Sequence, residues 1–102
     1  MANHLPENVA VVDSPDEQRY EILADGELAG FAEYRPRPGR LVFTHTETLP
    51  GFEGNGVGSR LAATALDAVR RRGWRAVPQC PFIAAYIDRH PELVDLVDPQ
   101  GA

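Results

Sequence analysis

The chain has 102 residues and a formal net charge of −5, and all ten of its basic residues are arginines. Its length suits one hydrophobic core, and its proportions of hydrophobic (43%) and charged (25%) residues are ordinary for globular proteins. We therefore expect residues 1–102 to form a single domain. The acidic balance argues against nucleic-acid binding, because affinity for phosphate backbones requires concentrated positive charge. Without a membrane-length apolar run or a signal-like N-terminus, we expect a cytoplasmic protein with no membrane partner.

Four segments rich in β-branched and aromatic residues predict strands in the first half of the chain. They are residues 9–12, 19–23, 28–34 and 41–48. Asp25-Gly26 is a hairpin signal, and we expect Pro36, Pro38 and Gly39 to form the next turn. An antiparallel meander is the simplest topology. Residues 1–8 and 98–102 are expected to be frayed tails.

The most informative stretch is residues 53–59, Glu-Gly-Asn-Gly-Val-Gly-Ser, in which glycine recurs at every second position. Helical spacing of apolar residues follows it and ends at Gly73, so the unit is strand, glycine loop and helix. Glycines bring backbone N–H groups close to a ligand, and the helix N-terminus adds partial positive charge. The loop therefore suits a phosphate or pyrophosphate, although glycines that merely permit a tight turn would leave the same pattern.

Two common phosphate-binding motifs do not fit this loop. A Walker loop needs a lysine, and the chain has none. A dinucleotide-binding fingerprint that starts at Gly54 and Gly56 needs glycine or alanine at position 59, where Ser59 stands.

The last third of the chain predicts a short strand over residues 74–78 and a second helix. Pro81 suits the first turn of that helix, which we expect to end near His90. Cys80 lies between the two elements, and as the single cysteine it excludes an intramolecular disulfide and a multi-cysteine metal cage. No metal is expected.

Taken together, these motifs resemble the GNAT superfamily of N-acetyltransferases, and in particular its small single-domain members. The resemblance rests on residues 45–47 (His-Thr-Glu), 53–59 and 80–86 (Cys-Pro-Phe-Ile-Ala-Ala-Tyr), and it covers roughly residues 20–97. Gly56 and Gly58 match the two small positions of the family's coenzyme A loop. Glu53 departs from the family's Gln or Arg, which removes a polar or positive side chain from the loop entrance.

The resemblance implies a compact α+β fold in the order β-β-β-β-α-β-α, with a mixed, largely antiparallel sheet whose fourth and fifth strands splay apart. Acetyl-coenzyme A would bind between those strands as the acyl donor. The chain lacks the residues for the helix pair that many GNAT enzymes carry after the first strand, so the acceptor side should be open. The residues expected to bind the coenzyme are Thr48, Gly54, Asn55, Gly56, Val57, Gly58, Ser59 and Arg60.

Acetyl transfer to an amine needs a neutral amine near the thioester and a proton for the departing thiolate. His45 and Glu47 alternate onto one face of their strand, and either could accept the amine proton, unless they only bond within the sheet. Cys80 could carry the acetyl group, donate a proton, or line the pocket. Tyr86 could protonate the thiolate, as the resemblance implies, or simply pack in the core. Direct transfer without an acyl-enzyme is the mechanism that the resemblance implies.

The acceptor implied is an amine, either a small molecule, a peptide or a protein. Because the chain has no lysine, an acceptor lysine would have to come from another molecule. We expect a monomer or a weak homodimer. The competing hypothesis is a non-catalytic module that binds coenzyme A or another protein, and it is motivated by Glu53 and by the missing acceptor-side helices.

Overall fold

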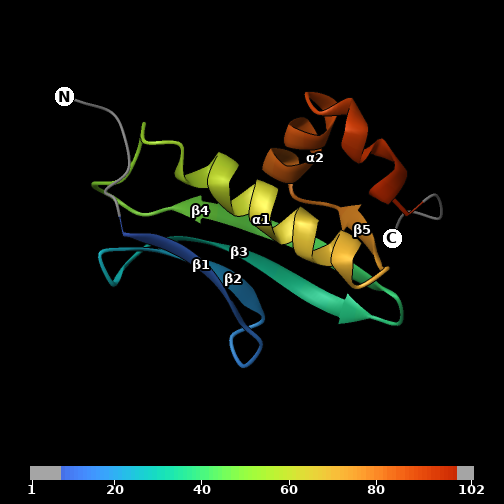
Figure 1. The fold of residues 1–102 in the computed structure, drawn as a ribbon, viewed down its shortest axis with the longest axis horizontal. Helices are drawn as coiled ribbons and strands as arrows, with labels where there is room; N and C mark the ends of the chain where they lie inside the picture. Colours follow the sequence, from blue (N-terminus) through green and yellow to red (C-terminus); the bar gives the residue numbers. More distant parts are fainter. Residues whose placement is uncertain (1–7, 99–102) are drawn as a thin grey trace.

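The computed structural model describes residues 8–98, which form one mixed sheet with two main helices and a final 3₁₀ helix (Figure 1). This α+β architecture confirms the expected fold class. The elements are β1 (Val9–Ser14), β2 (Arg19–Ala24), β3 (Glu27–Arg37), β4 (Arg40–Thr48), α1 (Val57–Arg71), β5 (Arg75–Pro78), α2 (Pro81–Asp88) and η1 (Pro91–Leu96).

The sheet has the spatial order β1-β2-β3-β4-β5. Its first four strands pair antiparallel and β5 pairs parallel to β4, so the predicted meander is correct. The β2–β3 hairpin turns at Asp25 and Gly26, whose φ angles of 52° and 81° are both positive. Positive φ at both central residues is the requirement of a type I′ turn, which Asp-Gly satisfies well.

The prediction that Pro36 belongs to the turn after β3 is wrong. Pro36 pairs with Leu41 inside the β3–β4 ladder, and the turn is confined to Pro38 and Gly39. Proline cannot donate to a second neighbouring strand, but β2 pairs with β3 only as far as Glu33. The last part of β3 is therefore an edge on that side, where proline is tolerated.

Helix α1 crosses one face of the sheet and buries its apolar side against β2, β3 and β4 (Figure 1). It ends in a Schellman motif, because the N–H of Gly73 bonds to the Arg70 carbonyl and the N–H of Trp74 bonds to the Val69 carbonyl. Gly73 has a φ of 74°, as its predicted position beyond the helix end requires. The buried residues of the helix are Val57, Leu61, Ala62, Ala65, Leu66 and Val69.

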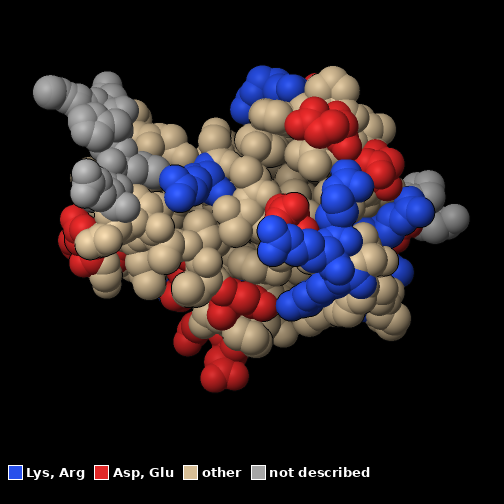
Figure 2. Space-filling view, in the orientation of Figure 1, with Lys and Arg blue, Asp and Glu red and all other residues tan. Residues whose placement is uncertain are grey.

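Arginine side chains gather over the C-terminal end of α1 (Figure 2). Residues 70–72 each pair with a carboxylate, at N···O distances of 2.9 Å for Arg70 to Asp95, 2.9 Å for Arg71 to Asp67 and 3.3 Å for Arg72 to Asp13. These cations therefore tie α1 to η1 and to β1 rather than standing free.

A β-bulge interrupts β4 at Thr44. Along β3 the register moves by one residue from Tyr34 to Glu33, whereas along β4 it moves by two, from Phe43 to His45. Thr44 is the extra residue, and a bulge of this kind bends a strand and increases its twist. The side-chain alternation of β4 consequently shifts after Phe43.

Beyond the bulge, Thr46 pairs with the fully buried Ala32, on the side of the sheet that α1 covers. His45 and Glu47 lie on the opposite side, where the ring centroid of His45 is 6.2 Å from that of Phe31. The bulge thus places Thr46 inside the fold. It places His45 and Glu47 on the face of the sheet that α1 does not cover, which is called the open face below.

Two expectations for the end of the chain need correction. Helix α2 stops at Asp88, and the 3₁₀ helix η1 that follows was not predicted. Of the expected frayed tails, Asn8 and Asp98 are held in place: the Asn8 carbonyl accepts from the Asp25 N–H at 2.8 Å, and the Asp98 N–H donates to the Ala76 carbonyl at 2.9 Å. The remaining tail residues, 1–7 and 99–102, lie outside the described residues. Within residues 8–98, no helix combines the length and the apolar character that crossing a membrane requires.

Candidate functional site

The loop before α1 adopts backbone conformations that favour glycine. Gly54 and Gly56 have φ angles of 81° and 76°, and Gly56 is the N-cap of α1 in the left-handed region. A Cβ added at either position would meet no atom within 4 Å. The glycines are thus required for the path of the backbone, and the space beside them is open.

The backbone donors of this loop have no hydrogen-bond partners in the part of the chain that the structure describes. None of the N–H groups from Gly54 to Ser59 bonds to another residue within 8–98, and the N-cap supplies no side-chain bond. No acidic residue lies in the first turn of α1. Arg60, the next residue, is exposed and makes no ion pair with any described residue. Free N–H groups, the positive end of a helix dipole and an available cation are features that favour the binding of an anion.

Glu53 has a structural role inside the loop. Its Oε1 atom accepts a hydrogen bond from the Gly51 N–H at 3.0 Å, and Gly51 has a φ of 94°. The carboxylate therefore stabilises the turn that precedes the anion site. It also puts one negative charge near the entrance, where the resembled family carries a polar or positive residue.

Two glycines, one inside the predicted coenzyme loop and one in β3, determine where the start of α1 lies. A Cβ at Gly58 would come 2.7 Å from the Phe82 Cζ atom, so Gly58 allows α1 to approach α2. A Cβ at Gly30 in β3 would come 2.6 Å from the Glu47 carbonyl oxygen and 2.9 Å from Val57 Cγ1. Sequence reasoning did not identify Gly30, because a single glycine in a strand does not reveal which element approaches it.

Strands β4 and β5 diverge where the candidate cysteine lies. Their last pair is Phe43 with Pro78, after which β4 continues to Thr48 paired with β3 but not with β5. The Cys80 N–H donates to the Phe43 carbonyl at 2.9 Å, and Pro81 begins α2 as predicted. The Cys80 thiol is only 3% exposed and donates to the Thr46 hydroxyl oxygen at 3.3 Å. The splayed arrangement thus leaves a buried thiol at the point of divergence.

His45 and Glu47 form a pair on the open face of the sheet. The His45 Nε2 and Glu47 Oε1 atoms are 3.1 Å apart, and about half of each side chain is exposed. Their shared face, predicted from strand alternation, is correct. Because Thr46 lies between them and points to the other side, β4 itself separates this pair from Cys80.

Tyr86 lies in a third place, on α2. Its ring stacks on His90 with centroids 3.9 Å apart, and its carbonyl accepts a 2.7 Å hydrogen bond from His90 Nδ1. It belongs to the buried core, and the spacing of four residues puts it on the same stripe of α2 as Phe82, which contacts Gly58. The four candidate catalytic residues are therefore brought together only in part.

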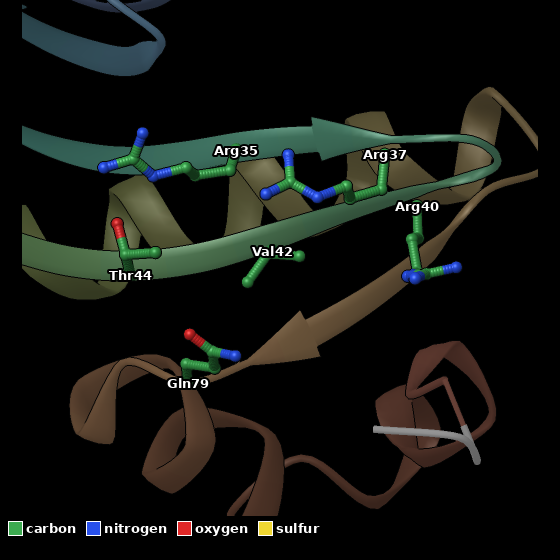
Figure 3. Close-up of a pocket in the computed structure, with 6 residues that line it drawn as sticks. All are labelled: Arg35, Arg37, Arg40, Val42, Thr44 and Gln79. Atoms are coloured by element: carbon green, nitrogen blue, oxygen red, sulfur yellow. The ribbon is translucent and has the colours of Figure 1, made fainter. Parts of the chain in front are cut away.

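Two neighbouring hollows on the open face were not found from the sequence. One, of about 190 Å³, collects side chains from β3, β4 and the segment after β5 (Figure 3). Its lining residues are Arg35, Arg37, Arg40, Val42, Thr44 and Gln79. The other, of about 180 Å³, shares Arg35 and Thr44 and is otherwise lined by Glu17, Gln18, Glu33 and Tyr34. Both hollows were missed from the sequence because the prediction assigned Pro36 to a turn and ended the strand at residue 34, before Arg35.

Comparison with known proteins places this arrangement in a family. Residues 19–96 match the sequence profile of a family described as GCN5-related N-acetyl-transferase. The match spans β2 to η1 and so includes the glycine loop, the divergence of β4 from β5, and every residue that lines the arginine hollow. No curated protein matches the chain at a significant level.

Proposed function

The chain belongs to the GCN5-related N-acetyltransferase family, and on that premise we propose that it transfers an acetyl group from acetyl-coenzyme A to an amine. The single observation that best supports the proposal is the row of unbonded N–H groups from Gly54 to Ser59 at the start of α1. A pyrophosphate would satisfy these donors, and Arg60 would pair with a further phosphate oxygen.

The divergence of β4 and β5 supports the same proposal. From Thr44 to Thr48, β4 pairs with no strand formed by residues 8–98 on the side that β5 leaves, so its backbone groups on that edge are available to an extended ligand. An amide-containing chain that enters there would bond to the strand edge as an added strand would. The pantetheine arm has this chemistry, and its thioester would then lie near Phe43, Thr46 and Cys80.

The reaction joins the acceptor nitrogen to the acetyl carbon, breaks the carbon–sulfur bond, and passes the amine proton to the departing sulfur. We assign the removal of the amine proton to the pair of His45 and Glu47, because histidine is the commonest general base in enzymes and both side chains reach the open face. Cys80 and Tyr86 remain the candidates for protonating the sulfur. Thr46, which accepts from the Cys80 thiol, would orient that group.

The competing proposal is a module that binds coenzyme A without transferring the acetyl group. Two observations favour it. The Glu53 carboxylate lies in the loop that would hold the pyrophosphate. In addition, β4 separates the His45–Glu47 pair from Cys80, so no described hydrogen bond connects the proposed base to the proposed acid.

The two proposals differ in turnover. Purified protein is incubated with acetyl-coenzyme A and a panel of small amines and peptides, and free thiol is measured over time. Acetyl transfer predicts amine-dependent release of thiol together with the acetylated amine in the mass spectrum. Saturable binding of acetyl-coenzyme A without release for any amine would support the binding module instead.

A further inference from the structure

The hollow lined by Arg35, Arg37 and Arg40 concentrates positive charge in an acidic protein. Three of the ten arginines of a chain with net charge −5 surround a space of about 190 Å³. They lie on the sheet face opposite α1: Arg35 pairs with Val42 and Arg37 pairs with Arg40, whereas the intervening Leu41 is buried in the core. In Figure 3 the three side chains are on the near side of β3 and β4.

These arginines differ from those at the end of α1, each of which has a carboxylate within 3.3 Å. Arg35 and Arg37 make no ion pair with any residue in the range 8–98. Arg40 has the Asp98 carboxylate 3.6 Å from its Nε, and that buried Nε has no hydrogen-bond partner in the described part of the chain. Two of the three arginines thus have no counter-charge among residues 8–98, and like charges held close together favour the binding of an anion.

The adjoining hollow has the opposite charge. Glu17 and Glu33 contribute carboxylates to it, and it meets the arginine hollow at Arg35 and Thr44. A ligand that spans the two would place a cationic group beside the glutamates and an anionic group beside the arginines. A zwitterionic amine has this distribution of charge.

The position of the hollows relates them to the proposed reaction. Thr44 and Gln79, both in the arginine hollow, each follow directly after the last residue pair of β4 and β5, Phe43 with Pro78. The acceptor would therefore approach the diverging strands from the open face, while the acetyl donor occupies the other side.

Resting on the proposed acetyl transfer, we propose that the acceptor is a small zwitterionic amine whose anionic group, a carboxylate or a phosphate, is held by Arg35, Arg37 and Arg40. Its ammonium group approaches Glu33 and Glu17, and before the attack its proton passes to the His45–Glu47 pair, whose His45 lies opposite Glu33 across β3 and β4. The acidic hollow attracts the amine, and the arginines decide which amines are accepted.

Binding is tested without acetyl-coenzyme A, so that the result does not depend on turnover. Nuclear magnetic resonance titrations follow the backbone amides as β-alanine, O-phosphoethanolamine and their neutral counterparts 3-amino-1-propanol and ethanolamine are added. We expect saturable shifts at residues 35–44 and 79 with the anionic amines only. The anionic amine with the lower Kd shows whether the site prefers a carboxylate or a phosphate. No saturable binding of either anionic amine up to about 10 mM, a concentration above typical substrate KM values, would overturn the proposal.

The arginines are then tested with the double variant Arg35→Gln/Arg37→Gln, and Arg71→Gln is the matched control because its only described ion pair is with Asp67 on the same helix. Loss of charged hydrogen bonds should weaken binding of the anionic amine at least tenfold in the double variant and less than twofold in the control. Equal weakening in both variants would mean a general charge effect and would refute the site.

Turnover separates this inference from the proposed function. If anionic amines bind in the hollow but release no thiol from acetyl-coenzyme A, the site stands and acetyl transfer to these amines fails. If neutral and anionic amines are acetylated with equal kcat/KM, and the double variant does not change that ratio, acetyl transfer stands and the zwitterion proposal fails.

Discussion

The ring of Phe82 lies directly over Gly58, so that a Cβ at position 58 would come 2.7, 3.1 and 3.2 Å from three of its ring atoms. This contact joins the start of α1, which carries the proposed anion site, to α2, whose N-cap is Cys80. The proposed anion site and the buried thiol are therefore held at a fixed separation by a glycine and an aromatic ring.

The Gly58→Ala variant should be less stable by about 1–2 kcal/mol, because the whole ring has to move when three of its atoms are overpacked. The predicted sign is opposite to the usual one, since alanine in place of glycine in a helix would otherwise increase stability by up to about 1 kcal/mol. Urea unfolding measures the change. In a Phe82→Leu background the penalty should disappear, and an unchanged penalty there would show that the ring is not its cause.

The Gly56→Asp variant should lose affinity for coenzyme A while it keeps its fold. The side chain has free space, but a negative charge would face the pyrophosphate, and a non-glycine residue at a φ of 76° costs about 1 kcal/mol. Gly56→Asn is the matched control, because it has the same size and backbone strain without the charge. Calorimetry should show that the Asp variant binds coenzyme A at least tenfold more weakly than the Asn variant. Equal affinities would show that this loop does not bind the pyrophosphate.

The Cys80→Ala variant should retain acetyl transfer within about tenfold of the parent, because direct transfer needs no acyl carrier and Tyr86 remains as a proton donor for the departing sulfur, whereas loss of an obligatory carrier would abolish transfer. The thiol is almost fully buried, so we also expect about 1 kcal/mol of lost stability. Intact-protein mass after treatment with acetyl-coenzyme A gives the independent readout. A stable acetyl adduct that disappears in the variant would establish Cys80 as an acyl carrier instead.

Stability should fall at alkaline pH through Tyr34. Burial, together with its 2.5 Å hydrogen bond to Asp13, raises the pKa of Tyr34 above its usual 10.0. A group whose pKa is raised by folding contributes fully below the unfolded pKa, and that contribution is lost as pH rises through the folded pKa. At pH 11 Tyr34 is ionised in the unfolded state but stays protonated in the folded state. The free energy of unfolding should therefore be about 1.4 kcal/mol lower at pH 11 than at pH 8.

Urea unfolding of the parent and of Tyr34→Phe at pH 8 and pH 11 checks this prediction. The variant lacks the ionisable hydroxyl, so its stability should depend less on pH by that amount. Burial also raises the pKa of Tyr20. Because Tyr20 is present in both proteins, its contribution to the pH dependence of stability cancels in the comparison. An identical pH dependence in the two proteins would contradict the role of Tyr34.

Local patterns in the sequence predicted most of the fold. Asp25-Gly26 specified its hairpin because both residues accept positive φ, and Gly73 specified the end of α1 for the same reason. The alternation of His45 and Glu47 correctly put them on one face. Each of these signals is carried by a few adjacent residues, so no knowledge of the partner element was needed.

The features that were missed depend on partners distant in the sequence. Pro36 lies in a strand because β2 ends before it, and that end is not visible from the residues around Pro36. The arginine hollow requires the register that pairs Arg35 with Val42. Likewise, Cys80 meets Thr46 only after β4 bends at its bulge, so plain alternation from the buried Phe43 would have turned Thr46 to solvent.

The extra residue at Thr44 makes an in-frame deletion the most informative edit of β4. Removing Thr44 would restore regular alternation and leave Phe43 and Thr46 inward and His45 outward, so every neighbouring side chain keeps its surroundings. Losing one residue from a strand ordinarily reverses the side-chain alternation beyond it, but here the deletion would remove the curvature of the backbone and the contacts of Thr44 itself, which lines both hollows and donates to the Glu33 carbonyl. Thr44 is thus dispensable for the interior, and what it supplies is the bend at which β4 turns away from β5.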